Sequence, residues 1–388
     1  MILIKNGYVK TMSRDGDLNK GEILIENGKI IAVGTDLEIP SDCEIIDAEN
    51  CIVSPGFVDA HCHMGMWESS IGFEGSDGNE MTDPITPEVR GIDAINPCDE
   101  AFAVALSGGV TTSVTGPGSA NVIGGTFLAM KNYGHRVDDM IIKNPIAMKC
   151  AFGENPKRVY NEQKKMPMTR MGSVSLLRKT LFEAREYMEL KNRAVENEKD
   201  MPKFDFKLEA MLPVMRGEIP LKAHAHRADD IFSSIRVAKE FGLKLTLDHC
   251  TEGHLIAEDL AKEGYPAFVG PSLGDKAKFE LSNLSFETPG VLNKAGIKVS
   301  IITDAPVIPL NYLSLCAGLA VKSGMEEEEA WKAITINPAE SIGIADRVGS
   351  IEVGKDADIA IFKGNPLMDV TYRTLYTLVD GKIVYTDK

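Results

Sequence analysis

Two different hydrophobic patterns divide the chain. Residues 1–54 and 345–388 alternate apolar and polar positions, as in MILIKNGYV and GEILIENGKIIAVG, which is typical of antiparallel strands. Asn27-Gly28 and Asp380-Gly381 interrupt these runs and predict two-residue hairpin turns. Neither end is long enough to bury a good core alone, so we expect both ends to pair into one small β-sandwich domain.

Residues 55–344 show short apolar runs that alternate with amphipathic helical stretches, such as 227–242 and 254–264. This alternation is typical of a parallel α/β sheet, and eight runs suit a (β/α)8 TIM barrel. A doubly wound sheet stays open as the alternative, because the third and seventh runs are the weakest. The predicted strands are Phe57–His63, Val110–Thr115, Thr126–Met130, Ile146–Phe152, Leu221–His226, Lys244–His249, Ala267–Val269 and Lys298–Thr303.

Two segments of this region are too long to be simple connections between strands. Residues 64–97 are rich in Gly, Asp and Glu, and we expect them to form a lid. Residues 155–206 contain a helical stretch at 173–194, which we expect to cover one side of the barrel mouth.

The charge balance excludes some classes of partner. The chain has 42 Lys and Arg against 57 Asp and Glu, a net charge of −15, which argues against nucleic acid and anionic membrane surfaces. The start of the chain does not resemble a signal peptide, and no apolar run approaches the roughly 18 residues of a membrane span. The seven cysteines are scattered without a CxxC pair, so we expect a cytoplasmic protein without disulfides.

The histidines are few but clustered. Six of the seven lie in the pairs His61/His63, His224/His226 and His249/His254. His61 and His63 are two apart on a predicted strand, so their side chains share a face and can bind one ion together. Neutral imidazole is a good ligand for zinc and similar ions. Alone, this pair could equally be two hydrogen-bonded core histidines.

The other groups favour a metal centre. His224 lies at the end of the fifth predicted strand, His249 ends the sixth, and Asp304 follows the eighth. The carboxyl ends of barrel strands meet at one mouth, where enzymes of this fold place their chemistry. Buried polar groups need partners, and such a cluster without an ion would leave several unpaired.

These residues also carry a family resemblance. VSPGFVDAHCHMG, with LTLDHC and SIITDAP further on, resembles the amidohydrolase superfamily of metal-dependent hydrolases, which includes dihydroorotase, imidazolonepropionase, hydantoinase and isoaspartyl dipeptidase. The closing GSIEVGKDADIAIF matches as well, so the resemblance covers nearly the whole chain. The resemblance implies two bound divalent ions, with zinc as the expected metal and Mn, Fe or Ni as alternatives. The resemblance assigns one ion to His61, His63 and Asp304, and the other to His224 and His249.

The fourth strand offers two candidates for a bridging ligand. In binuclear members of the superfamily a lysine there is carboxylated by CO2, and the resemblance points to Lys149 in AMKCAFGENPK. A buried ammonium is costly, and a carbamate would replace it with an anionic ligand. Glu154 is the alternative bridging ligand, and an ordinary ion pair of Lys149 with a neighbouring carboxylate is the third possibility.

These residues predict hydrolysis of a carbon–nitrogen bond in an amide, cyclic amide or peptide-like group. Two ions would lower the pKa of a bridging water and polarise a carbonyl, and Asp304 would be both ligand and proton carrier. A mononuclear deaminase of the same superfamily would carry Glu three residues after the fifth-strand histidine, whereas position 227 is Arg. A non-catalytic metal-bound homologue is the third alternative.

The predicted substrate is a small molecule that bears a carboxylate. Basic side chains follow the fourth and fifth strands, and Arg suits bidentate capture of carboxylates. Solvated surface charges are the alternative interpretation. We also expect a homo-oligomer. The residues predicted to contact the substrate are His226, Arg227, Asn121, Lys157 and Arg158.

Overall fold

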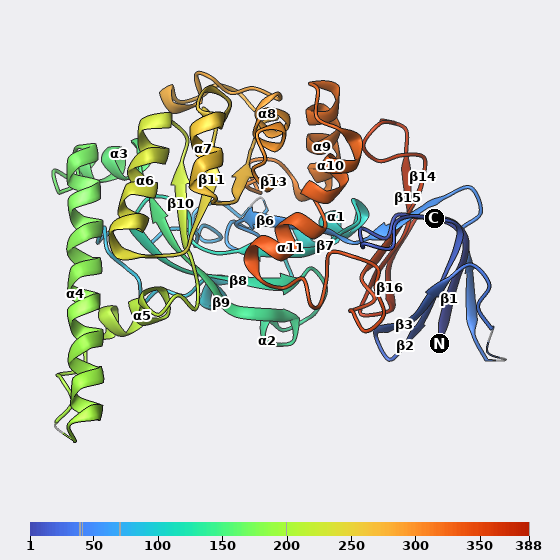
Figure 1. The fold of residues 1–388 in the computed structure, drawn as a ribbon, viewed down its shortest axis with the longest axis horizontal. Helices are drawn as coiled ribbons and strands as arrows, with labels where there is room; N and C mark the ends of the chain where they lie inside the picture. Colours follow the sequence, from blue (N-terminus) through green and yellow to red (C-terminus); the bar gives the residue numbers. More distant parts are fainter. Residues whose placement is uncertain (39, 41, 70, 199, 388) are drawn as a thin grey trace.

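A computed structural model of the chain describes residues 1–38, 40, 42–69, 71–198 and 200–387. Its strands form two eight-stranded sheets, one built from both ends of the chain and one from the middle (Figure 1). The sheet of the chain ends contains β1 (Ile2–Val9), β2 (Leu18–Glu26), β3 (Lys29–Gly34), β4 (Glu44–Asp47), β5 (Ile52–Pro55), β14 (Ile359–Lys363), β15 (Arg373–Val379) and β16 (Lys382–Thr386).

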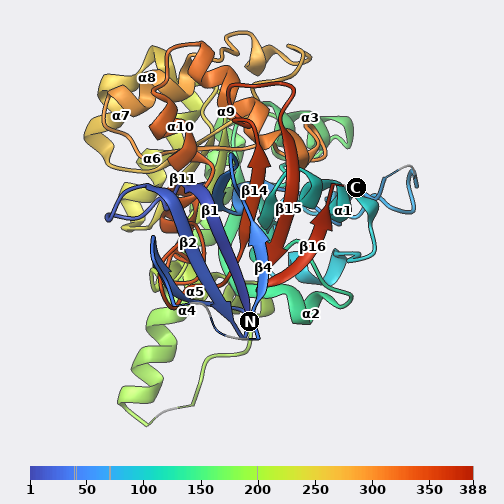
Figure 2. The same cartoon turned by 90° about the vertical axis from the view of Figure 1, so that its right-hand side faces the viewer.

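The two ends of the chain pair directly in this sheet. β5 lies between β1, its parallel neighbour, and β14, its antiparallel neighbour, so strands from both ends stand side by side (Figure 2). Both predicted hairpin turns are confirmed, with positive φ at Asn27 and Gly28 and at Asp380 and Gly381. The strands share one apolar cluster but belong to one hydrogen-bonded sheet, so a two-sheet sandwich is not confirmed. The domain boundaries after residue 54 and before residue 345 stay a prediction.

The middle of the chain forms a nearly closed barrel within a mixed α/β fold. Its strands follow one another in chain order. Backbone hydrogen bonds join the end of the first strand to the residues that follow the last strand, β13, and so nearly close the barrel. The Asp304 amide donates to the His61 carbonyl (3.2 Å), and the His63 amide donates to the Ala305 carbonyl (2.7 Å). The strands are β6 (Phe57–Cys62), β7 (Val110–Thr115), β8 (Ile123–Lys131), β9 (Ile141–Ala151), β10 (Leu221–Ala225), β11 (Leu245–His249), β12 (Ala267–Val269) and β13 (Val299–Ile301).

The direction of the third barrel strand corrects the prediction of an all-parallel barrel. β8 is antiparallel to both β7 and β9. The connection from β7 to β8, residues 116–122, is shorter than the dozen or more residues that a parallel crossover needs. The chain therefore turns back directly after β7. The Gly-rich connection lies at the mouth of the barrel, and Lys131, at the far end of β8, lies at the opposite end of the barrel.

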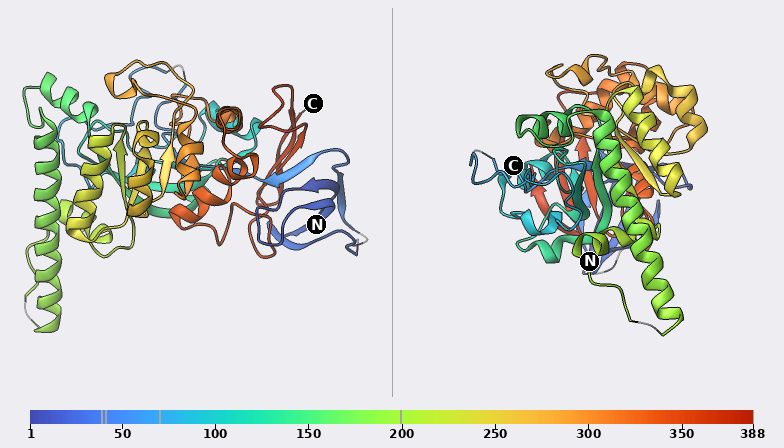
Figure 3. Two further views of the ribbon diagram at one scale, coloured as in Figure 1. Left: turned by 45° about the horizontal axis from the view of Figure 1, so that its top comes forward. Right: turned by 90° about the vertical axis from the view of Figure 1, so that its left-hand side faces the viewer.

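Helices cover the outside of the barrel. The stretches 227–242 and 254–264 are helical, as predicted, and form α6 and the η2–α7 pair. The 173–194 stretch lies in α4, but this helix runs along the outer side of the barrel against α5 and α6 (Figure 3). The prediction that this stretch covers the mouth is therefore wrong, because the apolar face of α4 packs on other helices. The helices are α1 (Glu100–Ser107), α2 (Val137–Met140), α3 (Glu154–Glu162), α4 (Arg170–Glu196), α5 (Phe206–Met215), α6 (Ala228–Phe241), α7 (Ala257–Glu263), α8 (Thr288–Lys294), α9 (Leu313–Lys322), α10 (Glu327–Ala333) and α11 (Ile336–Ile342), with the short 3-10 helices η1 (Gly91–Ala94), η2 (Gly253–Leu255), η3 (Phe279–Leu281) and η4 (Leu310–Tyr312).

The segment predicted to be a lid is anchored at the mouth. The Gly118 amide donates to the Gly78 carbonyl (2.7 Å), and the Thr86 amide donates to the Ile123 carbonyl (2.9 Å). Trp67, within this segment, lies edge-on to His63 with ring centroids 5.0 Å apart.

The helices of the described residues include none with the length and apolar character of a membrane span.

A buried cation joins the barrel to the sheet of the chain ends. Lys131, at the end of β8, pairs with Asp356 (2.9 Å), Asp358 (2.5 Å) and Asp380 (3.3 Å). Lys131, Asp356 and Asp358 are buried, and burial raises the pKa of Asp358 although Lys131 opposes that rise. Removing one partner of such a network leaves an uncompensated buried charge.

Lys131→Met is therefore expected to lower the free energy of unfolding by about 3–5 kcal/mol, because Asp358 loses its cation. Urea unfolding followed by circular dichroism measures this. The control is Arg136→Met, which removes an exposed pair with Asp139 and should leave the transition unchanged. A Lys131→Met protein as stable as the wild type would show that this network does not hold the two parts together.

Candidate metal centre

Three barrel strands bring five imidazoles to the mouth. His61 lies on β6 and His63 follows it, while His224 lies on β10, His226 follows it, and His249 ends β11. The parallel register of β10 and β11 aligns Ala225 with His249. All five side chains are buried. The structure therefore brings together histidines that are up to 188 positions apart in the printed sequence.

The first group of ligand-type atoms surrounds Asp304. Asp304 Oδ1 lies 3.1 Å from His63 Nε2 and 3.4 Å from His61 Nε2. The opposite ring nitrogens are held in place, because His61 Nδ1 lies 2.6 Å from Asp248 Oδ2 and His63 Nδ1 lies 2.7 Å from the Gly116 carbonyl. Such outer contacts fix which imidazole nitrogen faces a metal.

The backbone at two of these positions is unusual. His249 has φ 76° and Asp304 has φ 55°, in the left-handed region that non-glycine residues seldom adopt. His249 is the last residue of β11 and Asp304 lies three residues beyond the end of β13, so both stand where the strands end at the mouth. Strained backbone of this kind collects at functional sites, where the surrounding structure enforces it.

The second group consists of His224, His226 and His249, whose ligand-type atoms lie within 4.8 Å of one another. The rings of His226 and His249 are stacked, with centroids 4.5 Å apart and an interplanar angle of 17°. Burial lowers the pKa of all three imidazoles, that of His226 to about 3. Neutral rings keep the lone pairs that metal ligands need.

Unpaired buried atoms test whether a metal fits here. Among the described residues, His249 Nε2 and Asp304 Oδ1 are buried at the mouth without a hydrogen-bond partner. Burying such atoms without a partner is costly, and a divalent cation is a partner that imidazole nitrogens and a carboxylate can share. Ligand-type atoms of His249 also lie within 4.8 Å of those of His61 and Asp304, so His249 belongs to both groups and the two groups are neighbours. The donor set therefore fits divalent metal.

The structure places the two candidate bridging residues differently. Lys149 is fully buried, and its Nζ lies 3.2 Å from His61 Nε2. Burial lowers its pKa to about 8. Glu154 begins α3, and its carboxylate accepts a long hydrogen bond (3.5 Å) from the Glu280 amide. Lys149 thus contacts the first histidine group, whereas Glu154 contacts a loop beside the second.

Polar residues beneath the histidines were missed by the sequence prediction. Lys222 Nζ lies 3.2 Å from Asp248 Oδ2 and donates to the Ala60 carbonyl (2.8 Å). Asp59 accepts hydrogen bonds from the amide and hydroxyl of Thr303. A signal existed for Lys222, because it is two residues before His224 on the same strand and so shares its face.

Glu280 was missed as well, and no sequence signal pointed to it. It lies on η3 in the loop after β12, far from any recognised motif. Its carboxylate is buried, with Oε1 3.7 Å from His224 Nε2 and 3.6 Å from His226 Nε2. Only the path of the loop brings it to the histidines.

The predicted substrate contacts are divided between the mouth and its surroundings. His226 is part of the second histidine group, with Nδ1 2.8 Å from Thr251 Oγ1. Arg227 makes a two-pronged pair with Asp229 (2.9 and 3.1 Å) and lies over the ring of Phe279.

Asn121 is buried, and its side chain ties the lid segment to the barrel. Its Nδ2 donates to the Glu80 carbonyl (2.6 Å) and Thr86 Oγ1 (2.7 Å), and its Oδ1 accepts from Tyr160 (2.5 Å). Both amide hydrogens are thus used within the protein. Lys157 and Arg158 lie on α3, half-buried and exposed respectively, and no hydrogen bond or ion pair between described residues connects them to the histidines.

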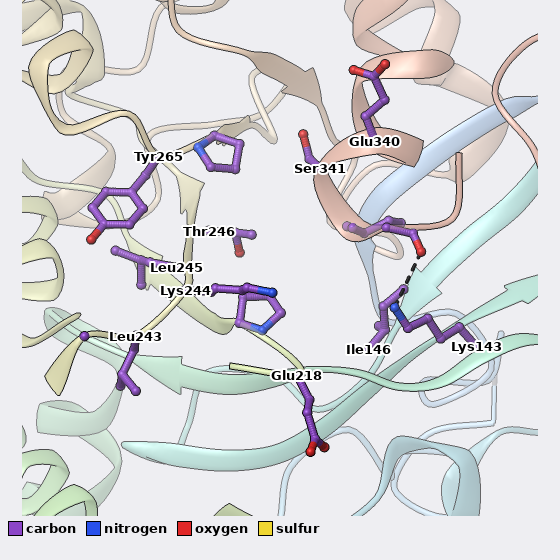
Figure 4. A pocket seen from close by; sticks show the side chains of 15 residues that line it. Lys143, Ile146, Glu218, Leu243, Lys244, Leu245, Thr246, Tyr265, Glu340 and Ser341 are labelled. Carbon is purple, nitrogen blue, oxygen red and sulfur yellow. Dashed lines mark hydrogen bonds between the residues drawn. The ribbon is translucent and has the colours of Figure 1, made fainter. Parts of the chain in front are cut away.

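A hollow of about 500 Å³ lies elsewhere, at the amino-terminal ends of the barrel strands (Figure 4). Lys143 donates to the Gly343 carbonyl (3.5 Å) across one side of it. Of the described residues that line it, none is a histidine or cysteine. Barrel enzymes place their chemistry at the carboxyl ends of the strands, so the histidine groups and not this hollow form the candidate site.

Known proteins are similar to this chain over part or all of its length. A family model described as the amidohydrolase family matches residues 215–384. Amidohydrolase tasK of Hapsidospora irregularis is 30% identical over 95% of this chain, which spans only 40% of that protein. A 5-methylthioadenosine/S-adenosylhomocysteine deaminase of Caldicellulosiruptor saccharolyticus is 24% identical, covering 100% of this chain and 93% of the relative.

A solved structure is similar over its full length. The crystal structure of an amidohydrolase from Thermotoga maritima MSB8 has a TM-score of 0.96 and 43% sequence identity, and each chain is covered to 100%. Proteins of this superfamily are hydrolases that use divalent metals, which suits the donor set at the barrel mouth. From its motifs, its fold and these matches together, the chain belongs to the amidohydrolase superfamily.

Proposed function

We propose that this chain hydrolyses a carbon–nitrogen bond in an amide, a cyclic amide or a peptide-like group of a small, carboxylate-bearing substrate. The supporting observation is that two groups of ligand-type side chains share His249 at the barrel mouth. Zinc is the expected metal, with manganese, iron or nickel as alternatives. The residues proposed to hold two divalent ions are His61, His63, Lys149, His224, His249 and Asp304.

Asp304 is the proposed proton carrier. When bound, a pair of ions would supply an acidic water at neutral pH and polarise the substrate carbonyl. Burial opposes ionisation of Asp304, but the adjacent His61 and His63 imidazoles outweigh it and hold its pKa well below the usual range. The ionised carboxylate can therefore accept a proton from the attacking water and pass it to the leaving nitrogen.

Lys149 is proposed to carry a carbamate. Burial lowers its pKa to about 8, which favours the neutral amine, the form that adds CO2. The new N–C bond replaces an N–H bond and releases a proton. The product is an anion beside the imidazoles, in place of a buried cation.

The mouth offers two cations to a substrate carboxylate. Arg227 is already paired with Asp229, and Lys278 Nζ lies 3.1 Å from Asn155 Oδ1. Both side chains are partly exposed, 28% and 34% respectively, so a ligand could reach them. Dipeptides, N-acyl amino acids and ring amides with a carboxylate are the proposed substrate classes.

A deaminase is the second candidate, since one of the matched relatives carries that name. Mononuclear deaminases that resemble this chain would carry Glu at position 227, where this chain has Arg. The buried Lys149 beside His61 also favours a two-ion site over a mononuclear one.

Asp304→Asn should reduce turnover by about a hundredfold or more, because the amide cannot accept the proton. Zinc- or manganese-loaded enzyme is screened against the three proposed substrate classes, and circular dichroism checks the fold. The control is Asp93→Asn, on an exposed carboxylate paired with Arg90. Full activity in Asp304→Asn would contradict the proposed role of this carboxylate.

Labelling with 13C-bicarbonate tests the carbamate. The expected result is a carbamate carbon signal in the 13C NMR spectrum of the wild type that is absent from Lys149→Arg. Lys222→Arg is the matched control, because Lys222 is equally buried in the barrel but pairs with Asp248. A signal that survives in Lys149→Arg, or no signal in metal-loaded wild type, would contradict this role for Lys149.

A further inference from the structure

Glu280 enters the site from a loop that the family motifs do not include. Its side chain is 1% exposed, and its Oε2 accepts a hydrogen bond from the Glu154 amide (3.1 Å). Its Oε1 lies 3.5 Å from Lys278 Nζ on the same loop. The neighbouring residue Phe279 is by contrast 72% exposed. The loop therefore turns one carboxylate inwards while its apolar neighbour faces outwards.

Gly153 leaves the space that Glu280 occupies. A Cβ at Gly153 would lie 3.0 Å from Glu280 Oε2 and 2.9 Å from Asp230 Oδ2, and Gly153 has φ 79°. Any side chain at this position would strain the backbone and crowd the two carboxylates. Glycine between β9 and α3 thus permits the approach of Glu280.

The distances around Glu280 suit a shared ion better than direct hydrogen bonds. Glu280 Oε1 lies 3.7 Å from His224 Nε2 and 3.6 Å from His226 Nε2. These separations exceed hydrogen-bond length. Two ligand atoms that each lie about 2.0–2.2 Å from a tetrahedral zinc ion are themselves about 3.3–3.6 Å apart.

The chemistry of the Glu280 side chain agrees with such a role. A carboxylate oxygen is a common zinc ligand, and it adds a negative charge that three imidazoles lack.

We propose that Glu280 is a ligand of the second ion, together with His224, His226 and His249. His226 is thereby assigned to the metal and not to the substrate. Binding of this ion then fastens the loop of residues 270–287 over the mouth, because a ligand on that loop completes the site. The proposal rests on the two-ion centre proposed above and adds an anionic ligand that the family motifs do not supply.

Metal content is the direct test. Wild type and Glu280→Gln are loaded with Zn2+, desalted and measured by inductively coupled plasma mass spectrometry, and affinities are measured by competition with a chelator. Wild type should retain about two ions, whereas Glu280→Gln should retain one and bind the second at least about tenfold more weakly. Glu287→Gln, an exposed glutamate on the same loop, is the matched control and should behave as wild type.

A second variant and a second measurement separate ligation from a general loss of structure. Gly153→Ala keeps every donor atom but crowds Glu280, so it should weaken the second ion as Glu280→Gln does. Hydrogen exchange of residues 270–287 should slow on addition of Zn2+ in the wild type, and this Zn2+-dependent slowing should be lost in Glu280→Gln.

Two ions bound to Glu280→Gln with wild-type affinity, or Zn2+-dependent protection of the loop in that variant, would overturn the role of Glu280. A wild type that retains no ion would contradict the proposed two-ion centre itself. Retention of two ions by every variant would contradict only the role of Glu280.

Discussion

The need to compensate ionisable groups buried in the barrel is the constraint on which the rest of the site depends. Asp248 is central to it, because one of its oxygens contacts both Lys222 Nζ (3.2 Å) and His61 Nδ1 (2.6 Å). Lys222 keeps Asp248 ionised despite complete burial, and burial together with the nearby lysines lowers the pKa of His61 to about 4. Burial and these lysines leave His61 neutral although Asp248 opposes this, and the contact with Asp248 keeps Nε2 turned towards Asp304 and Lys149.

The reversed strand β8 links this site to the remainder of the fold. Its preceding connection stays at the mouth, where the Gly116 carbonyl accepts from His63 Nδ1 and so orients that ring. The other end of β8 carries Lys131 into the carboxylates of the sheet formed by the chain ends. One strand therefore contributes both to the orientation of a candidate ligand and to the attachment of the second sheet.

Periodic features could be predicted from the sequence, and features that depend on loop paths could not. The hairpins at Asn27-Gly28 and Asp380-Gly381 follow from turn chemistry, and the histidines of the mouth follow from strand ends. The direction of β8 was predictable in principle, since the ten residues between the second and third predicted strands are too few for a parallel crossover. Glu280 and the lid contacts of Asn121 were not, because the path of a long loop leaves no periodic signal.

The claim that one mouth holds two ions is tested most directly by anomalous diffraction from crystals of the Zn2+-loaded protein. Two neighbouring zinc peaks are expected, one against His61, His63 and Asp304, the other among His224, His226, His249 and Glu280, with density extending Lys149 between them. A single peak with an unmodified Lys149, or zinc bound only away from these side chains, would contradict the claim.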